Sequence, residues 1–241
     1  YRVDQIIIYR DQPDESITMK YILGYMETPQ YLRKHLFDVR PELQYAGTLP
    51  PLRTPHHPLE ESLSMIDVGD FRDGVVIGGS GYNYDVDIGL EVPIEVRGKP
   101  PTKGARVTVE VMEKEPKLSG RSVKKKAIPE YWGYDLRGNK RRLSDLVHSP
   151  EWDLTIGTSR IGEPYTEVKK RLELDWIDAE KTLIVFGSYK EGVGEMIERE
   201  GRRPEEVFDY MINSIPDQGT ATVRTEEAVI STLAILNTLK E

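Results

Sequence analysis

The chain has 241 residues, of which 38% are hydrophobic, and this is enough apolar content for one large or two small globular domains. It has no cysteine, which excludes disulfides, thiolate nucleophiles and cysteine-ligated zinc, and it has no apolar run near the roughly 20 residues of a membrane helix. The formal net charge of −8 argues against a nucleic-acid partner unless the basic residues gather in one region. We therefore expect a soluble, cytoplasmic, globular protein.

The first part of the chain is expected to contain one strand and two helices. The pattern predicts a strand over residues 5–9, a helix over 16–27 whose apolar residues form no clean stripe, and a shorter helix over 31–37. A proline-rich stretch over residues 42–58 follows, and proline excludes regular secondary structure from it.

Residues 71–127 have a different sequence pattern. They contain short runs rich in β-branched residues, in which apolar and polar residues alternate, and glycine and proline separate the runs. This pattern predicts an all-β insertion. Four or five strands in this length suit a small barrel of the OB type, a fold that binds oligonucleotides. The alternative is a β excursion that only supports a dimer or an active-site loop.

After Tyr131 strands and helices alternate. The expected elements are strands over 153–159, 182–188 and 210–215, and helices over 164–177, 193–201, 204–211 and the end of the chain. Such alternation predicts a parallel sheet with helices on its faces. The predicted fold is therefore α/β, with a discontinuous domain over residues 1–68 and 129–241 and a barrel insert over 69–128.

The end of the chain combines an apolar strand, a polar loop and a helix. The loop over residues 216–224 follows the strand at its carboxyl end, where α/β proteins bind ligands. Thr225 is a good N-cap residue, and Glu226 and Glu227 fall in the first turn, where the helix dipole favours negative charge. Ile230 is one of the apolar residues that recur at helical spacing. We expect this loop to bind a ligand.

Five segments of the chain match sequence motifs of a known enzyme family, and they occur in the same order as in that family. They are "GTLPPLRTPHHP" (47–58), "YWGYDL" (131–136), "DLTIGTSRIGEP" (153–164), "LIVFGSYKEGVGE" (183–195) and "IPDQGTATVRTEEA" (215–228). With them the chain resembles the archaeal and eukaryotic RNA methyltransferases of the SPOUT class that carry an inserted OB-like domain. The resemblance covers nearly the whole chain and implies a trefoil-knotted enzyme that uses S-adenosylmethionine. Because that family begins with an additional strand and helix, we expect residues before Tyr1 to be missing.

The resemblance also implies where the cofactor binds. In the family, the loops that form the knot hold S-adenosylmethionine chiefly through backbone groups. Carried over position by position, the implied contacts are Thr158, Gly187, Ile215, Gln218, Gly219, Thr220 and Thr225. An alternative for Gly187 is that it only lets the chain turn with positive φ. A nicotinamide cofactor is not expected, because Gly192-Val193-Gly194 lacks the surroundings of a dinucleotide fingerprint.

Arg53 and Arg224 are the main catalytic candidates. Each lies in a matched segment, and an arginine can anchor a phosphate or stabilise negative charge on a base. The alternative for Arg224 is an ion pair with Glu226 or Glu227. Glu227 is a further catalytic candidate, and its alternative role is to complement the helix dipole.

The neighbouring histidines His56 and His57 are candidates for a general base, because histidine titrates near neutral pH, and His57 is kept among the catalytic residues. No metal site is expected, because adjacent ligands point in different directions and the only other histidines are His35 and His148.

A basic segment lies between Lys117 and Arg142, where nine basic and two acidic residues give a local balance of 9 − 2 = +7. It predicts an RNA-binding patch on an otherwise acidic body. The RNA-binding candidates are Arg121, Lys124, Lys125, Lys126, Arg141 and Arg142. The alternative is a solvated surface hairpin.

The leading hypothesis is an RNA methyltransferase that acts on ribosomal RNA. Enzymes of the resembling class generally work as homodimers, and the resemblance implies that the loop with Arg53 of one subunit reaches the cofactor of the other. The second hypothesis is a non-catalytic RNA-binding or ribosome-assembly protein that retains the fold. No membrane partner is expected.

Overall fold

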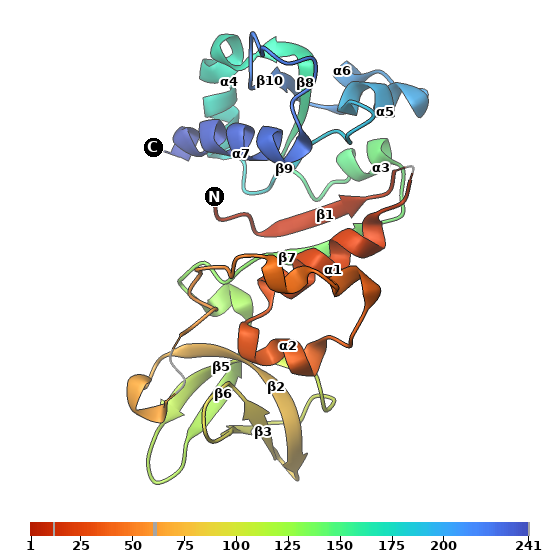
Figure 1. Ribbon diagram of the computed structural model, residues 1–241. Helices are drawn as coiled ribbons and strands as arrows, with labels where there is room; N and C mark the ends of the chain where they lie inside the picture. The colour runs from red at the N-terminus through yellow and green to blue at the C-terminus, as the bar shows by residue number, and fades with distance from the viewer. Residues whose placement is uncertain (12, 60–61, 241) are drawn as a thin grey trace. The chain divides into compact units, whose positions relative to one another are not determined.

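A computed structural model describes residues 1–11, 13–59 and 62–240 (Figure 1). The chain divides into two compact units. The C-terminal unit comprises Tyr1–Tyr1, Tyr9–Pro13 and Asn139–Glu241, and the barrel unit comprises Arg2–Ile8 and Asp14–Gly138. Within the described ranges, no helix is long and apolar enough to cross a membrane.

Five strands in the described part of the barrel unit close into a small barrel. They are β2 (Phe71–Ser80), β3 (Asn83–Asp87), β4 (Ile94–Arg97), β5 (Arg106–Glu113) and β6 (Ser119–Val123). The order around the barrel is β2-β3-β4-β6-β5, in which β4 and β6 run parallel and the other neighbours antiparallel. The expected four or five strands in this region are confirmed.

Side chains along the barrel strands alternate between the interior and the surface. On β3, Tyr84 and Val86 are buried whereas Asn83 is exposed, and on β4 Ile94 and Val96 are buried. Because successive strand residues face opposite sides, this alternation fixes the register of the pairing. The barrel core consists of Ile66, Val76, Tyr84, Val86, Ile88, Ile94, Val96, Val109, Val111 and Leu118.

The rest of the barrel unit contains two helices and most of a two-stranded sheet. The helices are α1 (Ser16–Glu27) and α2 (Gln30–Leu36), and the sheet pairs β1 (Gln5–Tyr9) with β7 (Asp135–Asn139). The first strand and first helix agree with the prediction, and α2 begins one residue earlier than expected. Strand β7 was not predicted, because its sequence is polar and its partner lies at the start of the chain.

Short 3-10 turns complete the described secondary structure. They are η1 (Pro41–Leu43), η2 (Ala46–Thr48), η3 (Leu63–Met65) and η4 (Lys125–Ala127) in the barrel unit and η5 (Asn237–Lys240) in the C-terminal unit. The proline-rich stretch therefore contains single turns, in agreement with the expectation that proline excludes longer elements there.

The C-terminal unit contains a parallel sheet whose strand order within the described residues is β10-β8-β9. Its elements are α3 (Leu143–Val147), β8 (Leu154–Pro164), α4 (Tyr165–Asp178), β9 (Thr182–Val185), α5 (Val193–Arg199), α6 (Pro204–Val207), β10 (Tyr210–Asn213) and α7 (Thr225–Leu236). The predicted alternation and the parallel sheet are confirmed, although α3 was not predicted.

Two helices of this unit share one core with the sheet. That core contains Leu154, Ile156, Tyr165, Val168, Leu172, Tyr210, Ile212, Leu236 and Leu239. In Figure 1, α5 and α6 lie to the right of the sheet. The buried faces of α4 and α7 therefore hold the three strands together and leave their carboxyl ends to the connecting loops.

Strand β8 is irregular at the point where the prediction placed a loop. Its pairing with β10 passes from Gly157 opposite Met211 directly to Glu163 opposite Ile212. The segment 158–162 therefore leaves the ladder, while the strand itself continues to Pro164. The strand therefore runs beyond the expected end at residue 159, whereas its regular pairing already ends at Gly157.

The last helix differs from its prediction in two details. Its N-cap is Arg224 rather than Thr225, because the Thr225 hydroxyl donates to the carbonyl oxygen of Gly187 (3.2 Å) and does not cap the helix. Ile230 is 59% exposed, so it does not belong to the buried face, whereas Leu236 does.

Candidate cofactor-binding site

Side-chain hydroxyls join the carboxyl ends of β8 and β9 and attach the start of α7 to the loop after β9. Thr158, at the end of the regular part of β8, donates to the carbonyl oxygen of Val185, the last residue of β9, at 3.0 Å. Thr225, the first residue of α7, donates to the carbonyl oxygen of Gly187 at 3.2 Å. The structure thus brings together the predicted cofactor residues Thr158, Gly187 and Thr225 within the C-terminal unit.

Position 187 requires glycine because the backbone of a neighbouring segment passes close to it, and not because of its own dihedral angles. Its φ is not in the left-handed region, so the alternative that it only permits a turn with positive φ is wrong. A Cβ atom here would lie 2.8 Å from the carbonyl oxygen of Glu191 and 3.0 Å from Cα of Gly192. Both atoms belong to backbone, which cannot move aside as a flexible side chain would. Any larger residue would therefore displace the loop after β9.

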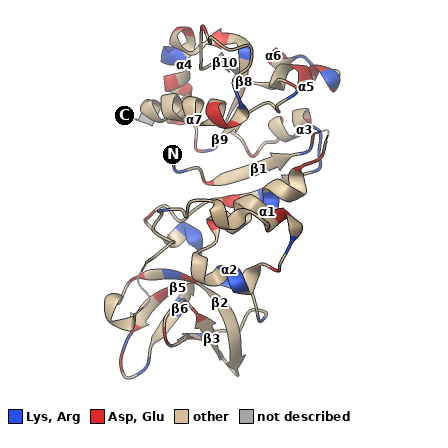
Figure 2. Ribbon diagram, viewed as in Figure 1, with Lys and Arg blue, Asp and Glu red and all other residues tan. Residues whose placement is uncertain are grey.

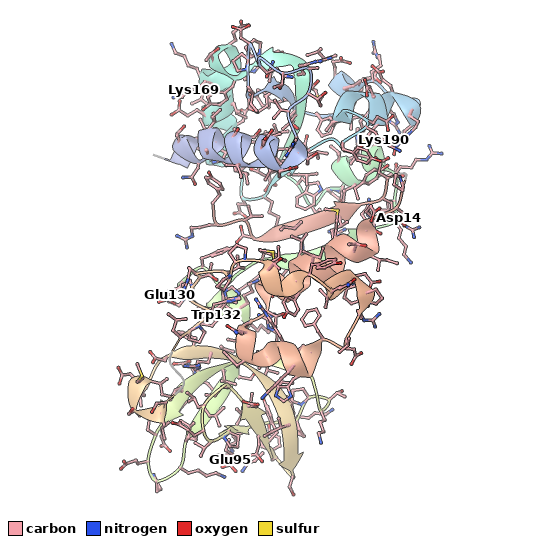
Figure 3. The ribbon with its side chains drawn as sticks, in the orientation of Figure 1. Asp14, Glu95, Glu130, Trp132, Lys169 and Lys190 are labelled. Carbon is pink, nitrogen blue, oxygen red and sulfur yellow. The ribbon has the colours of Figure 1, made fainter. Side chains whose placement is uncertain are left out.

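The loop after β9 is held by a compact turn at Ser188. The Ser188 N–H donates to the carbonyl oxygen of Glu191 at 2.9 Å, and the Ser188 hydroxyl oxygen accepts from the N–H groups of Lys190 and Glu191. The turn leaves Tyr189 at its tip, 69% exposed. Lys190, labelled in Figure 3, lies beside α5.

The loop after β10 is held at both ends by residues that the sequence did not single out. Asn213 accepts from the N–H of Ile215 (3.0 Å) and donates to the carbonyl oxygen of Arg160 (2.8 Å). Arg160 in turn donates to the carbonyl oxygen of Ala221 at 2.7 Å. No local sequence pattern predicted these hydrogen bonds, because they join two loops that are far apart in sequence.

The middle of this loop offers backbone groups to a ligand. The Gln218 side chain donates to the carbonyl oxygen of Thr220 at 3.0 Å, and Gly219 has open space around its Cα. Within the described chain, no backbone–backbone hydrogen bond involves residues 216–223. Apart from the carbonyl oxygens of Thr220 and Ala221, which accept from side chains, these backbone groups remain available and suit a cofactor that is recognised through backbone contacts.

Arg224 is exposed and its guanidinium has no hydrogen bond or ion pair with another described residue. The expected alternative, an ion pair with Glu226 or Glu227, is absent from this part of the structure. Instead the Glu227 carboxylate accepts from the backbone N–H of Arg224 at 3.2 Å and so caps α7. Figure 2 shows the acidic first turn of α7 in red. Glu227 thus has a structural role, while the Arg224 side chain is available for a partner.

Arg53 and the two histidines belong to the barrel unit. Arg53 is exposed. His56 and His57 both place Nε2 against the carbonyl oxygen of Glu27, at 2.9 and 2.8 Å. Burial lowers the pKa of His57 to about 4, although the bond to Glu27 opposes the shift. A group with this pKa is a weak general base near neutral pH, so the contacts favour a structural role.

Gly133, from the matched segment "YWGYDL", allows the histidines to pack. Its φ is +74°, and a Cβ atom would lie 2.6 Å from Cε1 of His56 and 2.7 Å from Oε1 of Glu27. Both the dihedral angle and the space therefore require glycine.

A buried ionic cluster beside the histidines was missed by sequence analysis. Arg106 donates to both carboxylate oxygens of Glu27, at 2.6 and 3.2 Å, and forms an ion pair with Asp73. Thr108 and the Trp132 indole N–H donate to Asp73 at 2.6 and 2.9 Å. Burial alone would raise the pKa of Asp73, but these three donors hold it below its usual range.

The cluster lines a cavity of about 360 Å³ in the barrel unit. Figure 3 labels Trp132 near the end of the barrel that faces α2. The residues come from α1, β2, β5 and the segment before β7, so only the tertiary fold brings them together. The cluster joins the first helix of the unit to the barrel.

The predicted basic patch is divided between the two units. Arg121 pairs with Glu110 at 2.7 Å and Lys125 with Asp135 at 3.1 Å. Lys124 and Lys126 are exposed and also belong to the barrel unit, whereas Arg141 and Arg142, both exposed, belong to the C-terminal unit. Figure 2 shows the turn η4, with Lys125, in blue.

Among the described residues no group of three or more histidine, aspartate or glutamate side chains is arranged to hold a metal ion. The loops at the ends of the parallel strands carry the Thr158 and Thr225 hydroxyls, backbone amides and the Arg224 guanidinium. The parallel sheet with helices packed on it defines this unit as α/β, and in such folds the loops at the carboxyl ends of the strands are where ligands bind.

The comparison with protein families identifies the family. A model described as "Putative RNA methyltransferase" matches residues 1–236, and the chain belongs to this family. This confirms the resemblance to RNA methyltransferases that the five segments carry.

Curated relatives extend over nearly the whole chain. An uncharacterized protein of Halobacterium salinarum is 31% identical over 98% of this chain and 87% of its own length. A 28S rRNA (uridine-N(3))-methyltransferase of Drosophila melanogaster is 34% identical over 92% of this chain, and one of Homo sapiens is 30% identical over 97%. The matches span 47% of the fly protein and 68% of the human protein.

Proposed function

We propose that the protein is an S-adenosylmethionine-dependent methyltransferase that modifies ribosomal RNA at a base nitrogen, N3 of a uridine. The family is one of RNA methyltransferases, and the fly and human relatives carry the name 28S rRNA (uridine-N(3))-methyltransferase. The observation that carries the proposal is that hydrogen bonds from Thr158 and Thr225 bring the end of β8 and the start of α7 to the end of β9 and the loop after it. The loop over residues 216–223, which makes no backbone–backbone hydrogen bond within the described chain, leads directly into this helix start.

The proposed cofactor contacts are the backbone groups of Ile215, Gln218, Gly219 and Thr220, together with Thr158, Gly187 and Thr225. These contacts suit S-adenosylmethionine, because residues 216–223 have no backbone–backbone hydrogen bonds in the described chain and Gly187 keeps the neighbouring loop close. We propose that these loops form the trefoil knot of the SPOUT class. Bound S-adenosylmethionine supplies a methyl group on a sulfonium, which is a good leaving group, so the chain's task is alignment of the nucleophile.

Arg224 is the proposed anchor for the RNA substrate. Its guanidinium is exposed and without a partner among the described residues, and it lies beside the loop that carries the cofactor contacts. Arginine binds phosphate oxygens in a bidentate manner that lysine does not reproduce. Arg224→Ala should lose methyl transfer and keep cofactor affinity, and Arg224→Lys should restore only part of the activity. Equal activity of Arg224→Ala and the wild type excludes this role.

Glu227 is proposed to assist catalysis in addition to capping α7. Glu227→Gln separates these two roles, because the amide oxygen can still accept from the Arg224 N–H. Loss of methyl transfer with an unchanged melting temperature supports a catalytic role. Unchanged activity leaves the cap as the only role of Glu227.

We propose that the barrel is an RNA-binding module of the OB type and that the protein works as a cytoplasmic homodimer. The closed five-stranded barrel within the described residues and the exposed basic side chains Lys124 and Lys126 support RNA binding. The dimer, and a contribution of Arg53 to the cofactor site of the other subunit, rest on the family resemblance.

Complementation tests the shared site. Arg53→Ala and Gly187→Trp should each be inactive as pure proteins. If the site is shared between subunits, a mixture refolded together should regain activity, because mixed dimers contain one site with both residues intact. A mixture as inactive as its components argues against the shared site, provided that subunit exchange is confirmed with two different affinity tags.

The proposed activity is tested by transfer of a tritiated methyl group from S-adenosylmethionine to deproteinised ribosomal RNA. Incorporation that depends on the protein, followed by nucleoside analysis showing 3-methyluridine, is the expected result. Incorporation at another atom corrects the site of methylation. RNA binding without any incorporation favours the non-catalytic RNA-binding protein.

A further inference from the structure

One end of the barrel carries an exposed tyrosine beside a segment that contains three basic residues. This barrel tip, as we name it, consists of the turn between β2 and β3 (residues 80–83) and the segment 97–104. The N–H of Gly98 donates to the carbonyl oxygen of Tyr82 at 2.9 Å, and Asn83 lies opposite Arg97 in the β3–β4 ladder. The two segments therefore lie side by side.

Tyr82 is the aromatic side chain of the tip. It is 67% exposed although its neighbour Tyr84 is buried in the barrel core. The backbone beside it is held by the bond from Gly98 and by the pairing of Ser80 with Asn83. An exposed ring on an ordered hairpin is a platform on which a nucleobase can stack.

The charge of the tip is positive. Arg97, Lys99 and Lys103 are exposed, and none of the three has an ion pair or side-chain hydrogen bond with another described residue. Residues 77–84 and 96–104 contain no aspartate or glutamate. The Gly104 N–H donates to the carbonyl oxygen of Val76 at 2.8 Å, which attaches the end of the segment to β2. The tip therefore combines three available cations with one aromatic ring.

Two other basic residues of the barrel unit are in a different state. Lys117 pairs with Glu95 at 2.8 Å, and Arg121 pairs with Glu110 at 2.7 Å. A phosphate that binds such a cation must compete with a carboxylate already in place. The cations of the tip carry no such competitor, so they are the better phosphate ligands.

Acidic residues limit the footprint of the tip. Asp85 lies opposite Glu95 in the β3–β4 ladder, two positions from the Asn83–Arg97 pair on the same face. Figure 3 labels Glu95 on the barrel. A polyanion is repelled from this part of the ladder, so a bound strand is confined to a few nucleotides at the tip.

We propose that the barrel tip binds single-stranded RNA, with Tyr82 stacked on one base and Arg97, Lys99 and Lys103 on the phosphates around it. The proposal deepens the proposed function, since it rests on RNA as the substrate and names where the barrel holds it. Double-stranded RNA does not fit, because its bases are paired and stacked and do not offer a face to Tyr82.

Binding of a fluorescein-labelled oligouridylate of about 12 nucleotides tests the proposal by anisotropy, since this length matches the site of one barrel of this type. Tyr82→Ala should weaken binding about 5- to 150-fold, the range for loss of one stacked base, and Tyr82→Phe should bind as the wild type does. Tyr45→Ala is the matched control, because Tyr45 is 73% exposed on the same unit and lies outside the tip.

The phosphate contacts are tested through the salt dependence of the binding affinity. Lys99→Gln with Lys103→Gln should reduce the slope of log affinity against log salt by about 1.4, or about 0.7 for each contact on a single strand. The matched control removes the same charge with Lys20→Gln and Lys34→Gln, two exposed lysines of the barrel unit, and should leave the slope unchanged.

The proposal is overturned if Tyr82→Ala and the Lys99/Lys103 double variant bind as the wild type does, or if the wild type does not bind the oligonucleotide. Methyl transfer measured on the same proteins separates this failure from failure of the proposed function. Methylation that persists in the tip variants, with unchanged Michaelis constant for RNA, rejects the tip and keeps the enzyme. Tip-dependent RNA binding without methylation keeps the tip and rejects the enzyme.

Discussion

Replacement of Arg106 by methionine (Arg106→Met) is expected to destabilise the barrel unit strongly. The guanidinium pairs with Glu27 and Asp73, whose side chains are 10% and 2% exposed. Removing one partner of a buried ion pair costs about 3–5 kcal/mol, because the remaining charge stays buried and uncompensated. Since Arg106 itself is 27% exposed and water can reach its place, we expect a loss near the lower end, about 3 kcal/mol.

Urea unfolding monitored by tryptophan fluorescence measures this loss. The chain has three tryptophans, of which Trp132 lies in the barrel unit, so a background with Trp152→Phe and Trp176→Phe reports that unit alone. The matched control is Arg121→Met, whose exposed pair with Glu110 should contribute at most about 1 kcal/mol. Both variants replace an arginine of a barrel ion pair with the same residue.

The dependence on pH gives a second test of the same reasoning. The pKa of Asp73 is lowered in the folded protein, so the stability from its pairing is present above its ordinary pKa and is lost as pH falls through the lowered value. Without Arg106 the Asp73 carboxylate protonates more readily, so the difference between variant and wild type should shrink as pH falls toward and below the ordinary aspartate pKa of about 4. A difference below about 1 kcal/mol at pH 7, or one that does not change with pH, would refute the reasoning.

Three further outcomes are expected. The pKa of His57 falls from 6.5 to about 4 on folding, so stability should decline as pH falls from 6.5 toward 4, and His57→Gln should flatten that decline in urea unfolding at several pH values. Gly187→Ala should abolish cofactor binding in calorimetry, because its Cβ would lie 2.8 Å from the carbonyl oxygen of Glu191, whereas Gly219→Ala should leave the loop backbone undisturbed. Thr225→Val should lower the free energy of unfolding by about 1 kcal/mol through loss of the bond to Gly187, and Thr225→Ser should not.

The sequence predicted those elements whose pattern is local. Strand 5–9 and helix 16–27 follow from residues that lie next to one another, and the barrel follows from alternation within each short strand. Strand β7 and helix α3 were missed, since β7 is polar and is stabilised by pairing with β1 rather than by its own residues. Periodicity reports burial on one face of an element and gives no information about a partner far along the chain.

The residues of the candidate site were likewise predicted only in part from the sequence. The family segments identified Thr158, Gly187 and Thr225, and these residues do meet in the C-terminal unit. The reason for Gly187 was not predictable, because the backbone that approaches it is placed by the turn at Ser188. The hydrogen bond from the Asn213 side chain to the carbonyl oxygen of Arg160 was also missed, since it joins loops that only the sheet brings together.

The histidines show the limit of inference from residue type. An imidazole titrates near neutral pH in water, so His57 was a reasonable general base from sequence. Burial lowers its pKa to about 4 against the opposing effect of the contact with the carbonyl oxygen of Glu27, and this environment comes from α1 and from tertiary packing. Reactivity is therefore a property of the folded environment rather than of the residue.

The central claim is that the loops at the three strand ends bind S-adenosylmethionine. Calorimetric titration of the wild type and of Gly187→Trp with S-adenosylmethionine, and separately with S-adenosylhomocysteine, tests it most directly. The account predicts saturable binding of both ligands to the wild type and no binding to the variant, with both proteins giving the same far-ultraviolet circular dichroism. Equal binding to wild type and variant, or no binding to the folded wild type, would contradict it.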